Sequence, residues 1–306
     1  MSDSAARDQS ARDQSARDQS ARDQDAAETE SAFSHPVVAP DVSAAYGSHP
    51  DQVIDFYAPR DGRAGAPVVV VLHGGAWRAP YDRLHVSPFA DFLARRGFAV
   101  ASVEYRRGSE LPQQRGSGPV AGRWPETFDD VAAAMDALPE LLALHMPSAD
   151  GRRIVVTGHS AGGQLALWAA ARHVLPEGSP WRLPRAPALR GVVALAPIAD
   201  FVSAVGLDVC SGAVGQFLGR AEDFTERAAH ADPALLLPTG IATAVVQGTT
   251  DLTVPHAVSE AFVDAAAKEG EMVGLTLLPD VGHFPLIDPA ADACAVVAEE
   301  IAQLAW

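Results

Sequence analysis

The stretch Ile154-Val-Val-Thr-Gly-His-Ser-Ala-Gly-Gly-Gln-Leu-Ala-Leu-Trp168 decides the fold that we expect for this chain. A β-branched apolar run breaks at Gly158-His159-Ser160-Ala161-Gly162, and an apolar helical run follows it. This order predicts a strand, a sharp turn and a helix, with the Ser160 hydroxyl projecting from the edge of a sheet. The flanking glycines are needed because side chains there would collide with the neighbouring strand and helix. Ser160 is therefore the candidate nucleophile, and an ordinary tight turn is the alternative.

Apolar runs and helical patterns alternate along most of the chain. The pattern predicts strands at 53–57, 67–72, 98–103, 190–195, 243–248 and 273–279, and helices at 86–96, 127–144, 256–269 and 289–304. Such alternation specifies an α/β fold in which helices cover both faces of a mostly parallel sheet. Two long connections, 106–125 and 200–238, are expected to form a small cap over the carboxyl ends of the strands, where ligands bind in such sheets.

Length and composition favour one large domain, which we place at residues 45–306. Hydrophobic residues make up 48% of the 306 positions, enough to bury a large core. Residues 1–44 are expected to be a disordered tail and lead-in, because residues 1–30 repeat Ala-Arg-Asp-Gln and have too little apolar area to offset the entropy of ordering. The tail lacks the pattern of a signal peptide, and no later stretch has the roughly 18 apolar residues of a membrane span. We therefore expect a cytoplasmic protein that does not bind membranes.

The charge of the chain argues against nucleic acid as a partner. The net charge is −16; the first 30 residues have 4 Arg against 8 Asp and Glu, or −4, which leaves −12 for the folded part. That sign disfavours binding to phosphate backbones or to anionic lipid. Cys210 and Cys294 lie far apart, so a disulfide framework is not expected, and no Cys/His cluster has metal-ligand spacing. We expect no metal, no cofactor and a small-molecule substrate; a homodimer is left open.

Two residues that follow late strands are candidates for the partners of Ser160. Asp251 follows the strand predicted at 243–248, and His283 follows the next one, which gives the chain order nucleophile, acid, base. In that arrangement the base activates the serine, and the acid fixes the tautomer of the base. Asp251 could instead cap the helix near Pro255, because Asp is favoured at such positions.

Other residues compete for these two roles. Asp200 and Asp280 also follow predicted strands and are the alternative acids. His159 and His73 are the alternative bases. His159 precedes the nucleophile and is expected to point away from its hydroxyl, whereas His73 begins a glycine loop that we expect it to brace.

The glycine loop His73-Gly74-Gly75-Ala76-Trp77 follows an early buried strand. At that place this kind of fold supplies amide donors to a developing oxyanion, so Gly74 or Gly75, together with Ala161, are the predicted oxyanion hole. A plain β-turn is the alternative. Trp77 could line a substrate pocket or pack the loop. Trp124, Phe201 and Phe217 lie in the two long connections and could line the pocket or form the core of the cap.

Taken together, these motifs resemble those of the α/β-hydrolase superfamily. His-Gly-Gly-x-Trp, Gly-His-Ser-Ala-Gly-Gly, Gly-x-x-Asp-x-x-Val-Pro and Gly-His-Phe are similar to those of kynurenine formamidases (arylformamidases) and small carboxylesterases, over about residues 53–304. The resemblance implies that Ser160 is the nucleophile, Asp251 the acid and His283 the base.

The resemblance also implies an activity. We expect a serine hydrolase that cleaves a small ester or activated amide through an acyl-enzyme, with arylformamidase activity on N-formylkynurenine as the first expectation. A short-chain carboxylesterase or acetyl esterase is the alternative. A catalytically inactive ligand-binding homologue is the alternative of another class, and the presence of all the catalytic residue types disfavours it.

Overall fold

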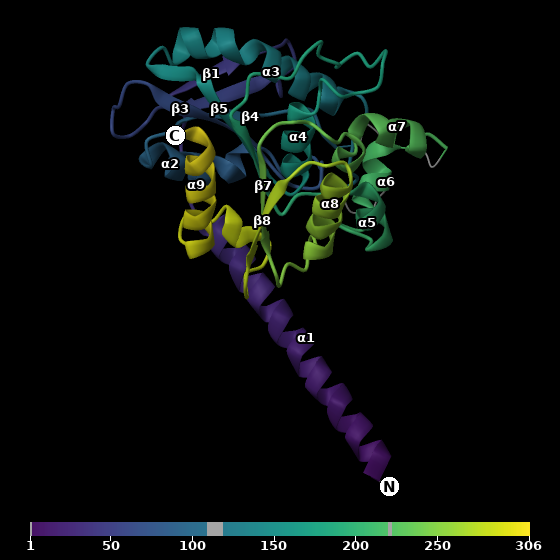
Figure 1. The fold of residues 1–306 in the computed structure, drawn as a ribbon. Coiled ribbons are helices and arrows are strands. Elements are labelled where there is room, and N and C mark those ends of the chain that lie inside the picture. Colours follow the sequence, from purple (N-terminus) through teal and green to yellow (C-terminus); the bar gives the residue numbers. More distant parts are fainter. Residues whose placement is uncertain (1, 109–118, 220–221) are drawn as a thin grey trace.

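One mixed sheet organises the computed structural model, which describes residues 2–108, 119–219 and 222–306 (Figure 1). In the described residues the sheet has eight strands in the order β1-β2-β4-β3-β5-β6-β7-β8. β1 and β2 pair antiparallel, as do β2 and β4, and the other neighbours are parallel. The strands are β1 (Val42–Ala45), β2 (Val53–Tyr57), β3 (Ala66–Leu72), β4 (Ala99–Val103), β5 (Ala149–His159), β6 (Gly191–Leu195), β7 (Thr243–Gly248) and β8 (Val273–Leu278).

Helices cover both faces of the sheet, as the sequence pattern predicts. The elements are α1 (Ser2–Ser34), α2 (Ser87–Arg95), α3 (Glu126–His145), α4 (Ala161–Ala170), α5 (Phe201–Gly206), α6 (Ala213–Leu218), α7 (Phe224–Ala231), α8 (His256–Lys268) and α9 (Asp292–Ala305), with short 3-10 turns η1 (Arg83–Val86), η2 (Pro233–Leu235) and η3 (Phe284–Leu286). α2 and α9 pack on one face, and α3, α4 and α8 on the other (Figure 1).

The central strands are apolar on both sides because both of their faces are covered. In β3, Val68 and Val70 belong to the core beneath α3, α4 and α8, whereas Val69 and Val71 belong to the core beneath α2 and α9. All seven residues of β3 are buried. Such a continuous β-branched run is typical of a strand inside a parallel sheet. The predicted mostly parallel α/β architecture is therefore confirmed.

The N-terminal segment differs from the prediction. Residues 2–34 form the helix α1, and Figure 1 shows it projecting from the body of the protein. Ala, Arg and Gln, which dominate the repeats, are good helix formers, and the disorder prediction considered only their lack of apolar area. The last turns also contact the body: Gln24 donates to the carbonyl of Asp280, and Ser31 Oγ lies 2.6 Å from Asp288 Oδ2.

The predicted domain start at residue 45 is also too late. β1 comprises Val42–Ala45 and pairs with β2, so a boundary at 44/45 would cut through a strand. Its sequence, Val-Ser-Ala-Ala, is short and does not alternate between apolar and polar residues, so the sequence did not predict a strand there. Only one of its four residues is buried.

The two long connections follow the predicted positions. The described residues of the second connection form α5, α6, α7 and η2. In the first connection, residues 109–118 lie outside the described part of the chain, as do residues 220–221 in the second. Phe217 of α6 stacks on Trp77 with ring centroids 4.3 Å apart, so the second connection packs on the glycine loop.

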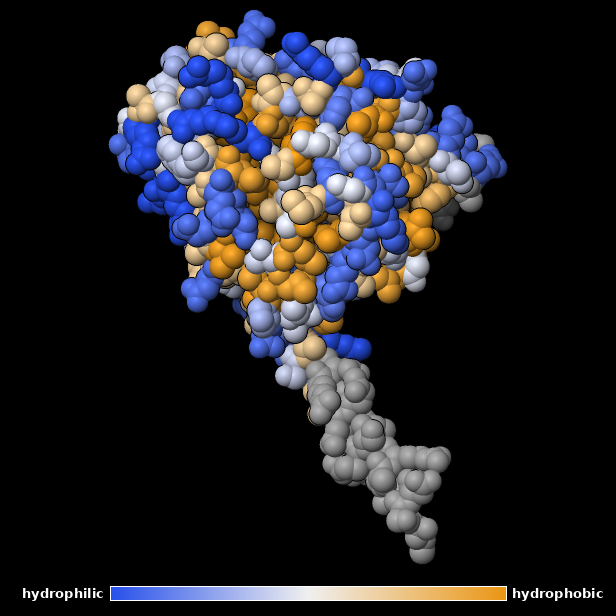
Figure 2. Space-filling model, in the orientation of Figure 1, coloured by the Kyte–Doolittle hydropathy of each residue, from blue (hydrophilic) through white to orange (hydrophobic). Residues whose placement is uncertain are grey.

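The surface mixes polar and apolar side chains. Figure 2 shows hydrophilic and hydrophobic residues interspersed over one face of the body. Among the described residues, no helix combines the length and apolar character needed to cross a membrane. Cys210 and Cys294 are both free thiols.

Candidate active site

Ser160 occupies a strained turn between β5 and α4. Its backbone is in a left-handed conformation, with φ 58° and ψ −119°, which is uncommon for a residue other than glycine. Its amide donates to the Leu195 carbonyl of β6 at 2.8 Å. A Cβ atom on Gly158 would overlap the carbonyl oxygen of Gly162, and one on Gly162 would overlap that of Leu72. The predicted need for glycine at both positions is confirmed.

Asp251 and His283 come together at the carboxyl ends of β7 and β8. Asp251 Oδ2 lies 2.7 Å from His283 Nδ1, and both side chains are buried. Gln247 Nε2 donates to the same carboxylate oxygen at 3.0 Å, while the amides of Thr253 and Val254 donate to Oδ1 at 2.8 and 2.7 Å. Each oxygen of the Asp251 carboxylate therefore has two hydrogen-bonding partners, which fix its position. The fixed carboxylate in turn holds the His283 ring in one orientation.

The competing acids lie elsewhere. Asp200 caps α5 by accepting from the Ser203 amide at 2.6 Å. Asp280 lies in a left-handed turn, with φ 57°, and its carbonyl accepts from Gln24. The helix α8 begins at His256 after Pro255, so Asp251 caps the turn at 253–254 and does not cap that helix.

His159 lies beside His283. Its ring centroid is 4.2 Å from that of His283, and its Nε2 lies 3.0 Å from the His283 carbonyl oxygen. A carbonyl only accepts hydrogen bonds, so His159 Nε2 carries a proton and donates it there. Burial, and then the neighbouring His283, keep the pKa of His159 well below its usual value, so its ring is neutral. We assign it a positioning contact with the backbone of His283.

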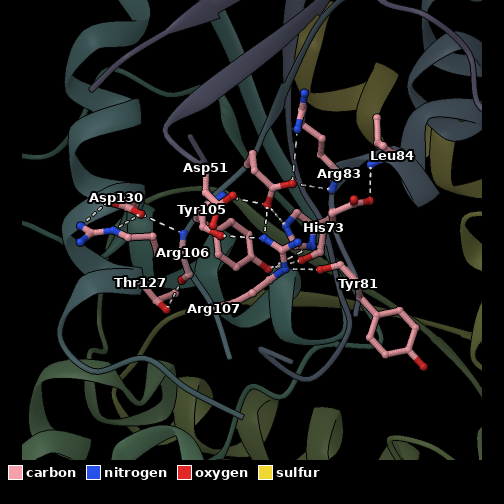
Figure 3. A network of polar contacts seen from close by, with 12 residues as sticks. Asp51, His73, Tyr81, Arg83, Leu84, Tyr105, Arg106, Arg107, Thr127 and Asp130 are labelled. Carbon is pink, nitrogen blue, oxygen red and sulfur yellow. Dashed lines mark hydrogen bonds and ion pairs between the residues drawn. The ribbon is translucent and has the colours of Figure 1, made fainter. Parts of the chain in front are cut away.

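His73 braces the glycine loop, as predicted. Its Nε2 lies 2.8 Å from Glu104 Oε1, its Nδ1 lies 2.9 Å from the Gly74 carbonyl, and its ring stacks on Tyr105 at 4.2 Å (Figure 3). Arg107 adds an ion pair to Glu104 at 2.7 Å. Burial opposes the charge on Glu104, but His73 and Arg107 outweigh it and lower its pKa to about 2. The buried network therefore fixes the strand end from which the loop departs.

The predicted oxyanion donors lie around Ser160. Ala161 is the first residue of α4, so its amide has no acceptor within the helix. Gly75 lines the same cavity as Ser160 and has φ 107°, a conformation that favours glycine. A Cβ atom on Gly74 would lie 3.3 Å from the Cβ of Ser160. Gly75 and Ala161 therefore remain the candidate donors to a negative oxygen formed at Ser160.

A cavity of about 260 Å³ contacts both Ser160 and His283. One part of its wall is an aromatic group in which Phe33 packs against Tyr81, His85 and Phe284. The wall also includes several residues near the second connection: Arg78, Cys210, Ser211 and Thr253.

The predicted pocket residues Trp77 and Trp124 do not line this cavity. Trp77 is fully buried between Phe201 and Phe217, so it packs the loop against the cap. Trp124 lies at a separate hollow together with Trp181, with ring centroids 5.4 Å apart. Packing in the cap core, one of the two roles that the sequence left open for Trp77, is therefore the role that the structure gives it.

Three residues of the site were missed by the sequence argument. Phe33 follows the polar repeats, and its aromatic character is the only local signal that this segment docks. Gln247 is polar within the apolar run of β7, a pattern that could have marked a buried partner for Asp251. Arg78 directly follows the glycine loop.

In the described ranges, no group of three or more His, Cys, Asp or Glu side chains could hold a metal ion.

With this geometry established, the family can be assigned. The BD-FAE family model matches residues 54–265. The chain belongs to the BD-FAE family. The region matched by the BD-FAE model includes Ser160 and Asp251 and ends before His283.

Curated relatives of this BD-FAE family chain include esterases. It is 25% identical to a probable isoprenylcysteine alpha-carbonyl methylesterase of Oryza sativa subsp. japonica over 85% of this chain and 61% of that protein. It is also 25% identical to Esterase LipC of Mycobacterium tuberculosis, over 84% of this chain and 64% of that protein. The chain thus spans about three fifths of the length of these relatives.

Solved structures share the fold of this BD-FAE family chain. A truncated form of a carbohydrate esterase from gut microbiota aligns with a TM-score of 0.70 and 19% identity over 87% of this chain and 97% of that one. Esterase B from Lactobacillus rhamnosis aligns with a TM-score of 0.68 and 19% identity over 94% and 93%. The α/β-hydrolase fold is therefore confirmed.

Proposed function

We propose that this chain is a serine carboxylesterase that hydrolyses small carboxylic esters through an acyl-enzyme on Ser160. The observation that carries the proposal is the 2.7 Å contact between Asp251 and His283 Nδ1 beside a cavity that also contacts the strained Ser160. The contact leaves Nε2 of His283 to exchange a proton with the serine.

The reaction has two halves. Ser160 Oγ attacks the ester carbonyl carbon as His283 takes its proton, and the amides of Gly75 and Ala161 stabilise the tetrahedral oxyanion. The C–O bond to the alcohol then breaks, and His283 returns the proton to the departing oxygen. Water, deprotonated by His283, attacks the acyl carbon; the bond to Ser160 Oγ then breaks, His283 returns the proton to Oγ, and the carboxylic acid leaves. Asp251 offsets the charge of the imidazolium in both halves.

The ester is preferred to the formamide that the motifs first suggested. The curated relatives carry the names methylesterase and esterase, and none of the relatives considered above is a formamidase. The aromatic side chains expected to hold an aryl leaving group do not contact this cavity: Trp77 is stacked on Phe217, and Trp124 lies at a separate hollow. The cavity, at about 260 Å³, lies just below the size of pockets that bind drug-sized ligands, which favours small substrates.

A substrate panel with one variant tests the proposal. Wild type should hydrolyse 4-nitrophenyl acetate and butyrate, and Ser160→Ala should lower kcat by several powers of ten and abolish labelling by an organophosphonate. Ser203→Ala, a serine of α5 outside the cavity, is the control and should keep both properties. N-formylkynurenine and acetylated sugars complete the panel.

Three outcomes would overturn parts of the proposal. Turnover of N-formylkynurenine far above that of every ester would restore the formamidase assignment. Labelling that persists in Ser160→Ala would move the nucleophile to another residue. No labelling and no turnover in wild type would identify an inactive ligand-binding homologue.

A further inference from the structure

Arg78 brings a positive charge to the cavity that holds Ser160 and His283. It is half-buried, and its Nη2 donates to the Cys210 carbonyl at 2.5 Å. Its Nε atom is buried and has no hydrogen-bond partner among the described residues. A guanidinium offers five N–H donors, and a buried donor without an acceptor costs free energy. Arg78, which lines the same cavity as Ser160, therefore has a cationic group whose donors are only partly used by the described residues.

Other arginines of the same region form ion pairs with carboxylates. Arg83 lies 2.6 Å from Asp55, Arg106 lies 2.6 Å from Asp130, and Arg107 lies 2.7 Å from Glu104. In Figure 3, Arg83 and Arg107 lie near His73, whereas Arg106 turns toward Asp130. Within the described part of the chain, by contrast, no carboxylate lies within ion-pair distance of Arg78. In a protein of net charge −16, this guanidinium without a carboxylate partner lies at the wall of the cavity.

The groups nearest to Arg78 do not supply its missing anion. Burial raises the pKa of the Cys210 thiol to about 11, more than Arg78 lowers it, so the thiol is neutral near pH 7. Asp251 is already held by His283, Gln247 and two backbone amides. Ser211 and Thr253, the remaining lining residues on this part of the wall, carry no charge.

We propose that Arg78 binds a carboxylate of the substrate, so that the preferred esters carry a free carboxylate. This inference rests on the carboxylesterase function proposed above. A planar carboxylate matches the fork of a guanidinium and would accept hydrogen bonds that Arg78 now lacks. Because the Ser160 side chain and Arg78 contact one cavity of about 260 Å³, only a short spacer fits between the ester carbonyl and the carboxylate. Half-esters of short dicarboxylic acids and acyl esters of small hydroxy acids have this shape.

Two pairs of substrates test the inference from both sides of the ester bond. Monomethyl succinate, with methyl succinamate as its neutral isostere, places the carboxylate on the acyl side. The 3-acetoxybenzoate anion, with 3-acetoxybenzamide as its neutral isostere, places it on the alcohol side. Both carboxylates are ionised at pH 7. For at least one pair, wild type should favour the anionic member by about tenfold or more in kcat/KM.

Variants at position 78 separate recognition from packing. Arg78→Met keeps an unbranched side chain as far as the Nε position but removes the guanidinium, and it should lower the anionic-to-neutral ratio of kcat/KM by about 10- to 100-fold. Arg78→Lys should recover part of that ratio, because the charge returns without the bidentate fork. Arg152→Met is the matched control: Arg152 is 91% exposed and lies outside the cavity, so its loss should leave the ratio unchanged.

A binding measurement keeps this inference separate from the esterase proposal. Calorimetry with Ser160→Ala should show saturable binding of monomethyl succinate or 3-acetoxybenzoate, and Arg78→Met in the same background should abolish it. Equal use of both members of each pair by wild type, or equal loss of both members in Arg78→Met, would overturn the role of Arg78 while leaving the esterase intact. Loss of Ser160 labelling and of all ester turnover, with anion binding retained, would overturn the esterase proposal alone.

Discussion

Asp251 Oδ2 lies 2.7 Å from His283 Nδ1, although the two residues are 32 positions apart in the chain. The parallel pairing of β7 with β8 creates this contact, because both residues follow the carboxyl ends of adjacent strands. The turn after β7 then fixes the carboxylate through the amides of Thr253 and Val254. The Asp251 carboxylate is therefore held by backbone amides, and these amides would stay in place if Asp251 were substituted.

Asp251→Asn should separate the catalytic role of this residue from its role in the turn. An Asn oxygen can still accept from the amides of the turn, so the fold should be retained. It cannot offset the charge of the His283 imidazolium, and its NH₂ favours the wrong tautomer, so kcat for an ester should fall on the order of 10³ to 10⁴ near neutral pH. Steady-state kinetics and far-UV circular dichroism measure the two effects.

The competing acids provide the controls for this substitution. Asp200→Asn and Asp280→Asn should change kcat little, since one residue caps α5 and the other lies in a turn that contacts α1. Near wild-type kcat in Asp251→Asn, with a collapse in either of the other two, would place the acid elsewhere.

Gly162→Ala should destabilise the protein through a steric clash at the turn after Ser160. The added Cβ would overlap the Leu72 carbonyl oxygen of β3, which is backbone in the centre of the sheet and cannot move aside easily. We expect the free energy of unfolding to fall by at least about 2 kcal/mol, together with a loss of kcat. Urea denaturation followed by tryptophan fluorescence measures the change.

Gly215→Ala is the matched control for that substitution. Gly215 lies inside α6, and a Cβ atom there would meet no atom within 4 Å. Alanine should then stabilise α6 by about 0.5 to 1 kcal/mol, because it loses less conformational entropy on folding than glycine. Equal effects of the two substitutions would contradict the steric explanation.

Glu104→Gln should remove a pH-dependent contribution to stability. The pKa of Glu104 is lowered from 4.5 to about 2 in the folded protein, so the unfolded chain binds more protons than the folded one between these values. The stabilisation from its charged form is fully present above about pH 4.5 and is lost as the pH falls toward 2. Wild type should exceed Glu104→Gln by roughly 3 kcal/mol at pH 7, and the difference should shrink at pH 3.5.

Chemical denaturation at pH 7, 5 and 3.5 tests this expectation. Glu140→Gln provides the control, since Glu140 is an exposed residue of α3 outside the network around His73. A stability difference for Glu104→Gln that stays constant across the three pH values would show that packing, and not charge, accounts for the loss.

The sequence by itself determined the architecture and named a short set of candidates for the reacting groups. Continuous β-branched runs such as Val68–Leu72 are typical of strands inside a covered parallel sheet, and the Gly158 and Gly162 spacing around Ser160 favours a tight strand-to-helix turn. These are local constraints of sterics and periodicity, so they can be recognised without knowing what lies across the sheet. Asp251 and His283 also come after predicted strands, but so do Asp200 and Asp280, and only the tertiary structure showed that Asp251 is the one in contact with His283.

Only the tertiary structure decided which side chains surround Ser160. Trp77 faces the cap core and not the cavity, because Phe217 of α6 stacks on it, and that contact joins segments distant in the chain. Phe33 and Arg78 reach the cavity from α1 and from the loop after β3, and whether Arg78 has an ionic partner depends on every chain segment that packs near it. Side-chain neighbours of this kind arise from long-range packing, which residue spacing does not encode.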